Sequence, residues 1–411
     1  MTYNAAATVN NFGTIRATDA YGFGVGVDGG GSLTNGSLNN NTALIEGFYG
    51  VGLVSGTAAN FGTISALGDS RGYGALLNDN VHLTNGAAGH ATALIEGFGG
   101  MYVSGNFNTV TNFGTISGAG GTALAFENSA TGNKLIVEAG CAFVGAVLGG
   151  GGTLDLDSGT GTITGRLAGG SVTVSGSMAA TAFQNFNTVE IGAAASFATS
   201  GAVTIAAGQS VIDAGVLTLG GTKAAVANAG TIETLGGTLT VKGAVTGAGG
   251  ATINGGTLDF AASFNQNVTF SGTTGTLELA RSQGYTATIT GFSKTGGTSL
   301  DLVDIGFVSA GEATYSGTKT GGVLTVTDGT HTAHITLKGN YLNSTFIAAS
   351  DGHGGVIIHD PRAPAAAIPS PHPFIAAMAA MAGGAGAELE RAAAWRIHAP
   401  PILAGPRPLL A

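Results

Sequence analysis

Two glutamate residues have a spacing that could support hydrolysis of a glycosidic bond. Glu46 and Glu96 lie in identical Thr-Ala-Leu-Ile-Glu-Gly-Phe segments that begin at Thr42 and Thr92, 50 residues apart. If these segments are two coils apart in a stacked structure, their backbones are separated by roughly 9–10 Å, which is near the separation of roughly 6.5–9.5 Å between the carboxyl groups of inverting glycosidases. The same row of positions would read Arg16, Glu46, Ser65, Glu96 and Ser117, which predicts a stabilising pair between Arg16 and Glu46. Since no aromatic platform or third acid accompanies the two glutamates in the sequence, we expect no catalytic residues.

The candidates for metal or thiol chemistry are isolated. The segment Gly149–Asp155 resembles a calcium-binding Gly-Gly-x-Gly-x-Asp repeat, but Asp155 comes one position late and no tandem copy follows, so a glycine corner before a strand is the prediction. His353 lies among glycines, and His359 is too isolated to complete a metal site with it. Cys141 is the single cysteine and lies in an apolar run, which favours a buried core position. We therefore expect no metal site and no cofactor site.

Five asparagines mark a repeating unit of about 25 residues. The motif Asn-Phe-Gly-Thr-Ile begins at positions 11, 60 and 112, and Leu-Thr-Asn-Gly segments lie between its copies. The asparagines that these segments share are Asn11, Asn35, Asn60, Asn85 and Asn112, with spacings of 24, 25, 25 and 27 residues. Apolar pairs at positions i and i+2 follow each one, for example Val51 with Leu53, and this is the periodicity of strands. One unit cannot bury its own apolar face, so we predict a parallel β-helix, or β-solenoid, in which successive coils stack.

The five asparagines have two interpretations. They could form a structural ladder at an interior turn, where each amide satisfies the hydrogen-bonding groups of its neighbours. If their side chains were exposed, the same row could instead contact carbohydrate. We favour the structural ladder.

The chain is expected to be divided into four parts. Residues 1–128 form coils of about 25 residues, and residues 129–280 form shorter coils of about 19–22 residues that repeat the pattern Gly-x-Leu-x-apolar. Within the second part, Asn228–Ile232 echoes the opening motif, which favours one continuous solenoid. Residues 281–360 are expected to form a less regular C-terminal β cap with antiparallel strands, Ser299–Asp304 among them. Residues 361–411 read as a Pro- and Ala-rich linker and tail, disordered or partly helical, whose apolar stretch 374–387 is too short for a membrane span.

Composition and charge exclude some classes of function. Only 9% of the residues are charged, compared with about 25% in an average domain, and 74 glycines suit a solenoid with many tight corners. The net charge of −9 and the absence of a basic patch argue against a nucleic-acid partner. Residues 1–10 contain no Lys, no Arg and no apolar core, so we expect no N-terminal signal peptide. Export would then follow another route, or the sequence is a fragment of a longer protein.

The style of the repeats resembles a known group of surface proteins. The Asn-Phe-Gly-Thr-Ile motifs, the Gly-Gly-Thr-Leu runs and the block Asp351–Ile357 are similar to the passenger regions of proteobacterial autotransporters and to filamentous surface adhesins. The resemblance covers about residues 8–360 and implies a right-handed parallel β-helix that is displayed on, or released from, a Gram-negative cell. The chain departs from this group because no membrane β-barrel pattern follows residue 360 and no N-terminal secretion domain precedes the repeats.

These observations predict an all-β, non-catalytic protein that is extracellular or displayed at the cell surface and serves attachment or surface coating. Its expected partners are host or environmental glycans or other surface proteins. Two alternatives remain open, namely a polysaccharide-active β-helix enzyme and a spacer fragment of a larger autotransporter.

Overall fold

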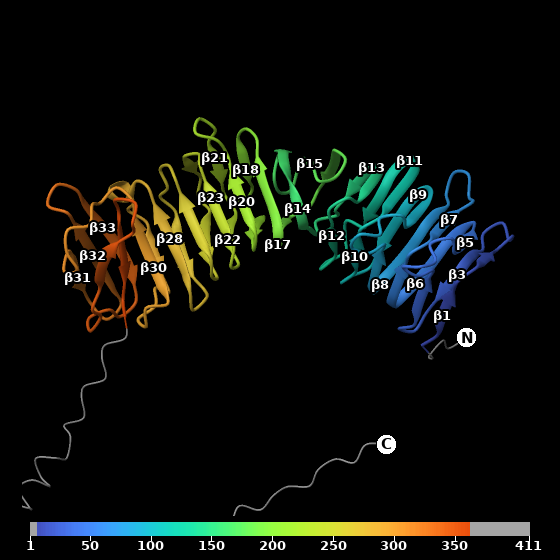
Figure 1. Cartoon of the computed structure of the whole chain (residues 1–411), viewed down its shortest axis with the longest axis horizontal. Coiled ribbons are helices and arrows are strands. Elements are labelled where there is room, and N and C mark those ends of the chain that lie inside the picture. The colour runs from blue at the N-terminus through green and yellow to red at the C-terminus, as the bar shows by residue number, and fades with distance from the viewer. Residues whose placement is uncertain (1–5, 362–411) are drawn as a thin grey trace, which may run out of the picture. The chain divides into compact units, whose positions relative to one another are not determined.

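Short parallel strands stacked in successive coils make up most of the chain in the computed structural model, which describes residues 6–361 (Figure 1). The prediction of an all-β parallel β-solenoid is confirmed, with about 13 turns. Helical structure among the described residues is limited to one 3-10 turn, η1 (Ser282–Gly284). No helix in this part of the chain is long and apolar enough to cross a membrane. The predicted tail, with its apolar stretch 374–387, lies outside the described residues.

The asparagine-bearing strands form the first of three columns, in which each strand pairs in parallel with the equivalent strand of the next coil. The register joins Asn11 to Asn35, Asn35 to Asn60, and so on to Asn112. The strands of this first column are β1 (Thr8–Asn11), β4 (Ser32–Asn35), β6 (Tyr49–Asn60), β8 (Tyr73–Asn85), β10 (Thr109–Asn112), β12 (Lys134–Val137), β14 (Thr153–Gly165), β17 (Thr188–Thr199), β19 (Ser210–Asp213), β22 (Thr231–Thr234), β25 (Gly250–Ile253), β27 (Asn267–Phe270), β29 (Thr288–Thr290) and β33 (Thr332–Lys338).

The second column follows the first around each coil and consists of two runs. Its strands are β2 (Thr14–Arg16), β5 (Leu44–Gly47), β7 (Thr63–Ala66), β9 (Leu94–Ser104), β11 (Thr115–Phe126) and β13 (Ala142–Leu148), and then β14, β17, β20 (Val216–Leu219), β23 (Thr238–Val241), β26 (Thr257–Phe260), β28 (Gly275–Leu279) and β30 (Thr298–Leu302).

The third column closes each coil. It contains β3 (Phe23–Val27), parts of the long strands β6, β8, β9, β11 and β13, and β16 (Thr181–Gln184), and further along the chain β18 (Val203–Ile205), β21 (Val226–Asn228) and β24 (Val245–Thr246).

Alternating burial explains why these short segments are strands. In the second column, Ile45, Ile64, Ile95 and Ile116 pair in register and are at most 1% exposed, while the residues on either side point outward. The repeated Asn-Phe-Gly-Thr-Ile motif also requires its glycine, because a Cβ atom at Gly62 would lie 2.1 Å from the carbonyl oxygen of Ala43 in the preceding coil. The glycine therefore lets two coils approach at a corner where any larger side chain would separate them.

Two segments lie at positions that the repeats alone did not indicate. The leucine of the first Gly-x-Leu-x-apolar pattern, Leu154, belongs to the first column, whereas Leu217, Leu239 and Leu258 pair with one another in the second. Asn228 ends a third-column strand, so its echo of the opening motif lies at a different corner of the coil from Asn11. The sequence pattern Asn-x-Gly-Thr-Ile thus indicates a tight corner, but it does not indicate which corner of the coil this is.

The regular stacking is interrupted near the middle of the chain and ends in antiparallel strands. β15 (Ser171–Gly176) pairs antiparallel with both β14 and β16. At the end, β31 (Ala313–Gly317) and β32 (Gly321–Thr327) extend antiparallel from β33, while β35 (Val356–His359) pairs antiparallel with β30 and β34 (Ile347–Ser350). The segment Ser299–Asp304 was expected in the antiparallel cap. Its strand β30 does pair antiparallel with β35, and it is also the last parallel member of the second column, since it pairs with β28.

Candidate functional site

The five asparagines of the repeat form a ladder inside the solenoid. The Nδ2 atom of each donates to the Oδ1 atom of the next, from Asn11 to Asn35, Asn60, Asn85 and Asn112, over 2.8–2.9 Å. Each Nδ2 also donates to a backbone carbonyl of the adjoining second column, as Asn35 does to Thr63 at 2.9 Å. The side chains are at most 6% exposed, so they are not available to a carbohydrate.

Two further sets of buried amides were not found from the sequence. Asn108 Nδ2 donates to Asn133 Oδ1 at 3.2 Å, and Asn228 Nδ2 donates to Gln266 Oε1 at 2.8 Å. Asn108 and Asn133 are 25 residues apart, so the repeat spacing could have revealed them. Gln266 carries no such signal, because its longer side chain reaches back to Asn228 over two coils and also donates to the Asn228 carbonyl at 2.8 Å.

The row that contains Glu46 and Glu96 has the predicted order. Arg16 pairs with Glu46, and Ser65 Oγ donates to Glu96 Oε1 at 3.2 Å. Asp69 and Phe98 line a hollow of about 310 Å³ together with Glu96, but Glu46 does not line it. The two carboxylates are also separated by Ser65 and each already has a partner, so the structure does not join them in one site.

The other sequence candidates are placed apart from one another. Asp155 pairs with Lys134 at 2.8 Å, and Lys134 also contacts Glu190 at 2.6 Å. Cys141 is buried, and this burial raises the pKa of its thiol to about 12, which keeps it protonated and unreactive. No group of three or more His, Cys, Asp or Glu side chains with the geometry of a metal site occurs within residues 6–361.

A row of three carboxyl groups lies on the outer face of the second column. Asp259, Glu278 and Asp301 are partners in register on β26, β28 and β30. Burial and the neighbouring carboxylates raise the pKa of Glu278 to about 7 and that of Asp301 to about 6. The neighbouring His353 side chain has the opposite effect on the pKa of both carboxyl groups. The shared position in the Gly-Thr-Leu-x-apolar repeats could have revealed Asp259 and Glu278 from the sequence.

A groove of about 380 Å³ lies on the outer face of the third column, in the first coils. One outward row runs through Gly26, Gly52, Leu76 and Tyr102, and both ends of the groove carry aromatic rings, Phe23 and Tyr102. The missing side chain of Gly26 leaves the floor low, the Phe23 ring covers Gly52, and Leu76 and Tyr102 rise above the sheet. We call this surface the aromatic groove.

Phe23 at the groove and Tyr73, which contacts Tyr102, each pack on a glycine of the following coil. A Cβ atom at Gly52 would lie 2.6 Å from the Phe23 ring, and one at Gly99 would lie 2.3 Å from the Tyr73 ring, so each ring packs directly on glycine backbone. Phe23 is also 5.1 Å from Tyr49 between ring centroids, and Tyr73 is 5.7 Å from Tyr102. Phe23 remains 42% exposed. The groove therefore presents rigid apolar rings that are partly open to solvent.

Polar side chains form the other edge of the aromatic groove. Asp28, Asn78 and Ser104 line it, and Asn78 and Ser104 pair in register with Val54 in a second outward row. Burial, with a smaller effect from the charge of Glu127, raises the pKa of Tyr102, so its hydroxyl remains a hydrogen-bond donor. The groove combines ring faces with donors and acceptors along one side, which is the arrangement of many small-molecule sites.

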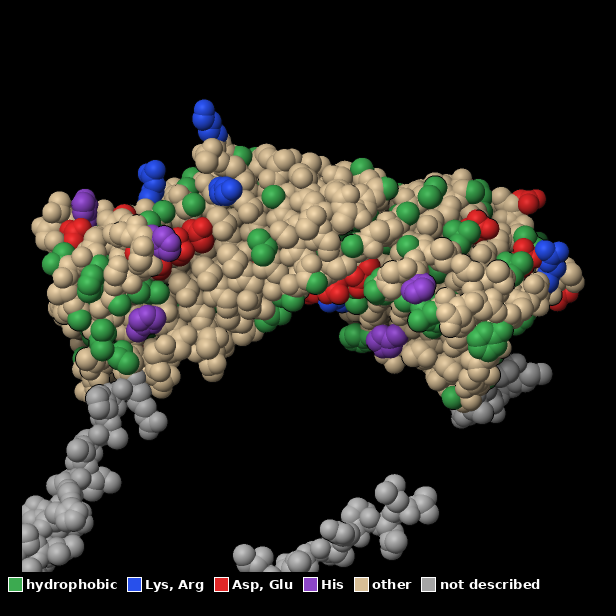
Figure 2. All heavy atoms as spheres, in the orientation of Figure 1, with side chains coloured by type: hydrophobic (Ala, Val, Ile, Leu, Met, Phe, Trp, Pro, Cys, Tyr) green, Lys and Arg blue, Asp and Glu red, His purple; other side chains and the backbone are tan. Residues whose placement is uncertain are grey.

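The rest of the visible surface is poor in charge. Figure 2 shows that uncharged side chains and backbone cover most of one face, with acidic side chains gathered in a few places. No protein-family model and no curated protein matches the chain. The β-solenoid itself is compatible with the passenger-like repeats that the sequence resembles.

Proposed function

We propose that the protein is a non-catalytic, surface-displayed or secreted β-solenoid of the passenger type that attaches to glycans through the aromatic groove. The observation that carries the proposal is the packing of Phe23 and Tyr102 at the two ends of a groove with polar residues along one edge. A sugar ring has an apolar C–H face and a rim of hydroxyl groups, so it matches a surface of this kind.

The direction of the groove favours a linear polymer over a single sugar. The rows that form it run from coil to coil, and successive coils are about 4.8 Å apart. This step is close to the length of one pyranose unit, so consecutive sugars would meet Gly26, the Phe23 ring that covers Gly52, Leu76 and Tyr102 in turn. The scarcity of charge on the protein suits a neutral glycan, and the net charge of −9 disfavours nucleic acid.

Affinity electrophoresis in gels that contain neutral polysaccharides tests this proposal. We expect some of these polymers to retard the full chain, and we expect the double variant Phe23→Ala, Tyr102→Ala to bind at least tenfold more weakly. The reason is the loss of two aromatic contacts, each worth about 1 kcal/mol, where 1.4 kcal/mol corresponds to a factor of ten in affinity.

Phe12→Ala provides the matched control, because Phe12 is 57% exposed and lies outside the groove. This variant should bind as the unmodified chain does. Equal retardation of the double variant and of the unmodified chain would contradict the proposal, as would loss of binding in Phe12→Ala.

The row Asp259–Glu278–Asp301 favours a second candidate function, hydrolysis of a glycan. Register partners in neighbouring coils are about 4.8 Å apart, close to the roughly 5–5.5 Å between the carboxyl groups of retaining glycosidases. A pKa of about 7 would let Glu278 act as the general acid while a neighbouring aspartate stays ionised. The test is to measure the release of reducing ends from a polysaccharide. Release by the unmodified chain and by Glu233→Gln, but not by Glu278→Gln, would establish this activity. No release by the unmodified chain from any glycan that the groove binds would exclude the activity for those substrates.

A further inference from the structure

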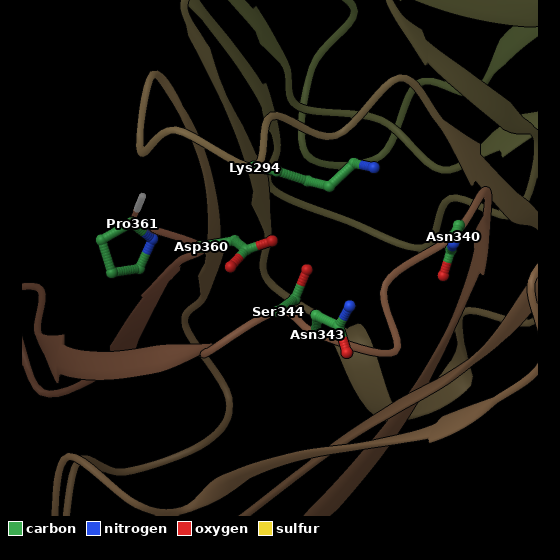
Figure 3. A pocket seen from close by; sticks show the side chains of 6 residues that line it. All are labelled: Lys294, Asn340, Asn343, Ser344, Asp360 and Pro361. Carbon is green, nitrogen blue, oxygen red and sulfur yellow. The ribbon is translucent and has the colours of Figure 1, made fainter. Parts of the chain in front are cut away.

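Three loops near the end of the described chain enclose a small polar cavity of about 250 Å³ (Figure 3). Lys294 comes from the β29–β30 loop, Asn340, Asn343 and Ser344 come from the β33–β34 loop, and Asp360 with Pro361 follows β35. Figure 3 shows the side chains of Lys294, Ser344 and Asp360 arranged around one open space. The cavity is remote in sequence from the aromatic groove and shares no residue with it.

Asp360 is an unusual residue in this cavity because it is almost completely buried and only one of its two carboxyl oxygens has a hydrogen-bond partner. It is 1% exposed, and its Oδ1 atom accepts the backbone N–H of Thr345 at 3.1 Å. Its Oδ2 atom is also buried but has no hydrogen-bond partner among the described residues. A buried carboxylate oxygen without a donor is costly, so a ligand that supplies one recovers that cost on binding.

The opposite side of the cavity carries a positive charge. Lys294 is exposed and forms no ion pair within residues 6–361, and its Nζ atom lies 5.6 Å from the centre of the Tyr341 ring. Tyr341 is fixed beneath it, because this ring is buried and its hydroxyl donates to the carbonyl of Phe292 at 2.9 Å. The ring next to Lys294 is therefore held in place, and Lys294 and Asp360 do not neutralise each other by an ion pair.

The chemistry of the lining excludes two ligand classes. A metal ion would find one carboxylate and a nearby ammonium group, which repels it, and an apolar ligand would leave the charged groups without partners. A ligand that fits must donate hydrogen bonds to Asp360, present an anion to Lys294 and carry groups that bind the amides and hydroxyl of Asn343 and Ser344. A volume of about 250 Å³ is below the range of roughly 300–1,000 Å³ for sites that hold drug-sized ligands, so one small unit is accommodated.

We propose that this cavity binds a single acidic sugar residue, whose carboxylate contacts Lys294 and whose vicinal hydroxyls donate to Asp360. Asn343 and Ser344 contact the remaining hydroxyls. The site is a pocket and not a groove, so it takes a free sugar acid or the terminal unit of an acidic glycan. It is independent of neutral-glycan binding in the aromatic groove.

Isothermal titration of the full chain with glucuronate tests the proposal, with glucose and glycine as comparison ligands. Glucuronate should bind, glucose should bind at least tenfold more weakly because it lacks the anion, and glycine should not bind. Lys294→Met should weaken glucuronate binding at least tenfold without changing the weak binding of glucose. Lys319→Met is the matched control, since Lys319 is an exposed lysine of the β31–β32 turn outside the cavity.

Asp360→Asn gives a second measurement that does not depend on Lys294. The Asn Oδ1 atom keeps the hydrogen bond from Thr345, so the fold should persist by circular dichroism while affinity for glucuronate falls at least tenfold. No binding of glucuronate, equal binding of glucose, or unchanged affinity in Lys294→Met would each overturn the proposal. Binding of glycine in preference to glucuronate would overturn it too, because the cavity would then recognise an ammonium group paired with a carboxylate.

Discussion

One buried position of the first strand column is occupied by asparagine in the N-terminal coils and by other residue types in the later coils. In the N-terminal coils this position is an asparagine from Asn11 to Asn112, and the five amides form one hydrogen-bonded ladder. In the later coils the register places other residues at the same position, namely Val137, Leu156, Ile191, Asp213, Thr234, Ile253 and Phe270. Both halves keep the same parallel pairing, so the ladder is not needed for the coil itself.

The difference shows that apolar packing and amide hydrogen bonding depend to different degrees on the residues of the neighbouring coils. An apolar residue such as Ile191 packs against whatever lies around it, so it does not depend on the identity of the residue in the next coil. A buried amide depends on its neighbours in both directions, because it must donate on one side and accept on the other. Asp213 is the informative exception, since this buried carboxyl group occupies the ladder position with Ile191 and Thr234, and no carboxamide, beside it.

The largest expected effect is that of a substitution in the centre of the ladder. Asn60→Ala leaves the Asn85 Oδ1 atom without its donor, removes one acceptor from Asn35 and creates a cavity. Since each unsatisfied buried group costs about 1–3 kcal/mol, we expect a loss of about 2–5 kcal/mol and a lower thermal midpoint by circular dichroism. Thr34→Ala, on the outward side of the same column, should change stability by less than about 0.5 kcal/mol. Equal melting of the two variants would show that the ladder adds no stability.

Replacement of Asp213 should increase stability, in contrast to the loss expected for Asn60→Ala. Burial raises the pKa of Asp213 from its ordinary value of 3.8 to about 7, and its Oδ2 atom has no partner among the described residues. Because this pKa is higher in the folded than in the unfolded state, the folded state is favoured most below pH 3.8, and stability falls as the pH rises towards 7. Asp213→Asn should therefore stabilise the protein at pH 8 by about 1–3 kcal/mol.

Urea unfolding of this variant at pH 5 and at pH 8 measures the effect. The gain should be smaller at pH 5, where the aspartate already holds its proton. A gain of the same size at both values would mean that the carboxyl group does not titrate between them.

A smaller effect is expected at the end of the ladder. Asn112→Val introduces the residue that the next coil carries at Val137. It removes the acceptor of the Asn85 Nδ2 atom, which keeps its bond to the Thr115 carbonyl at 3.1 Å. The Asn112 Nδ2 atom itself contacts the Ala142 carbonyl at the long distance of 3.4 Å. We expect a loss of about 1 kcal/mol in urea unfolding. A loss as large as that of Asn60→Ala would contradict the view that interior members depend on two neighbours.

The smallest effect is expected on the outer face. Arg16 is 58% exposed at its pair with Glu46, and exposed ion pairs contribute about 0.2–1 kcal/mol. Arg16→Ala should reduce stability within that range at low salt, and 0.5 M NaCl should remove most of the difference. A difference that persists in salt would indicate that the arginine acts through packing of its stem.

The fold could be predicted from the sequence because its signals repeat. The spacing of Asn35, Asn60 and Asn85 fixed which strands pair, and the apolar alternation around Ile64 and Ile95 fixed which side faces the core. The antiparallel strand β15 could not be predicted, because it occurs once and breaks no rule of strand periodicity. The parallel pairing of β30 with β28 could not be predicted either, since alternation does not distinguish a parallel from an antiparallel neighbour.

The candidate sites were harder to predict than the fold. The aromatic groove depends on Gly26 and Gly52, and glycine in a solenoid is first explained by its corners. The cavity at Asp360 combines three loops with no shared pattern, and the burial of that carboxyl is a property of the folded chain alone. Glu278 lies within a repeat that the sequence reveals. That it forms a row of three carboxyl groups could only be seen from the register, which places Asp259 and Asp301 beside it.

The ladder has one direction, because every amide from Asn11 to Asn85 donates towards the higher residue number. A single asparagine cannot be lost without leaving its neighbours unmatched, but removal of residues 36–60 would join Asn35 to the partner that Asn60 now has. The same reasoning applies to duplication of a whole coil. Selection can therefore lengthen or shorten this molecule in units of one turn while point changes within the unit are resisted, and its reach becomes an evolvable property separate from its stability.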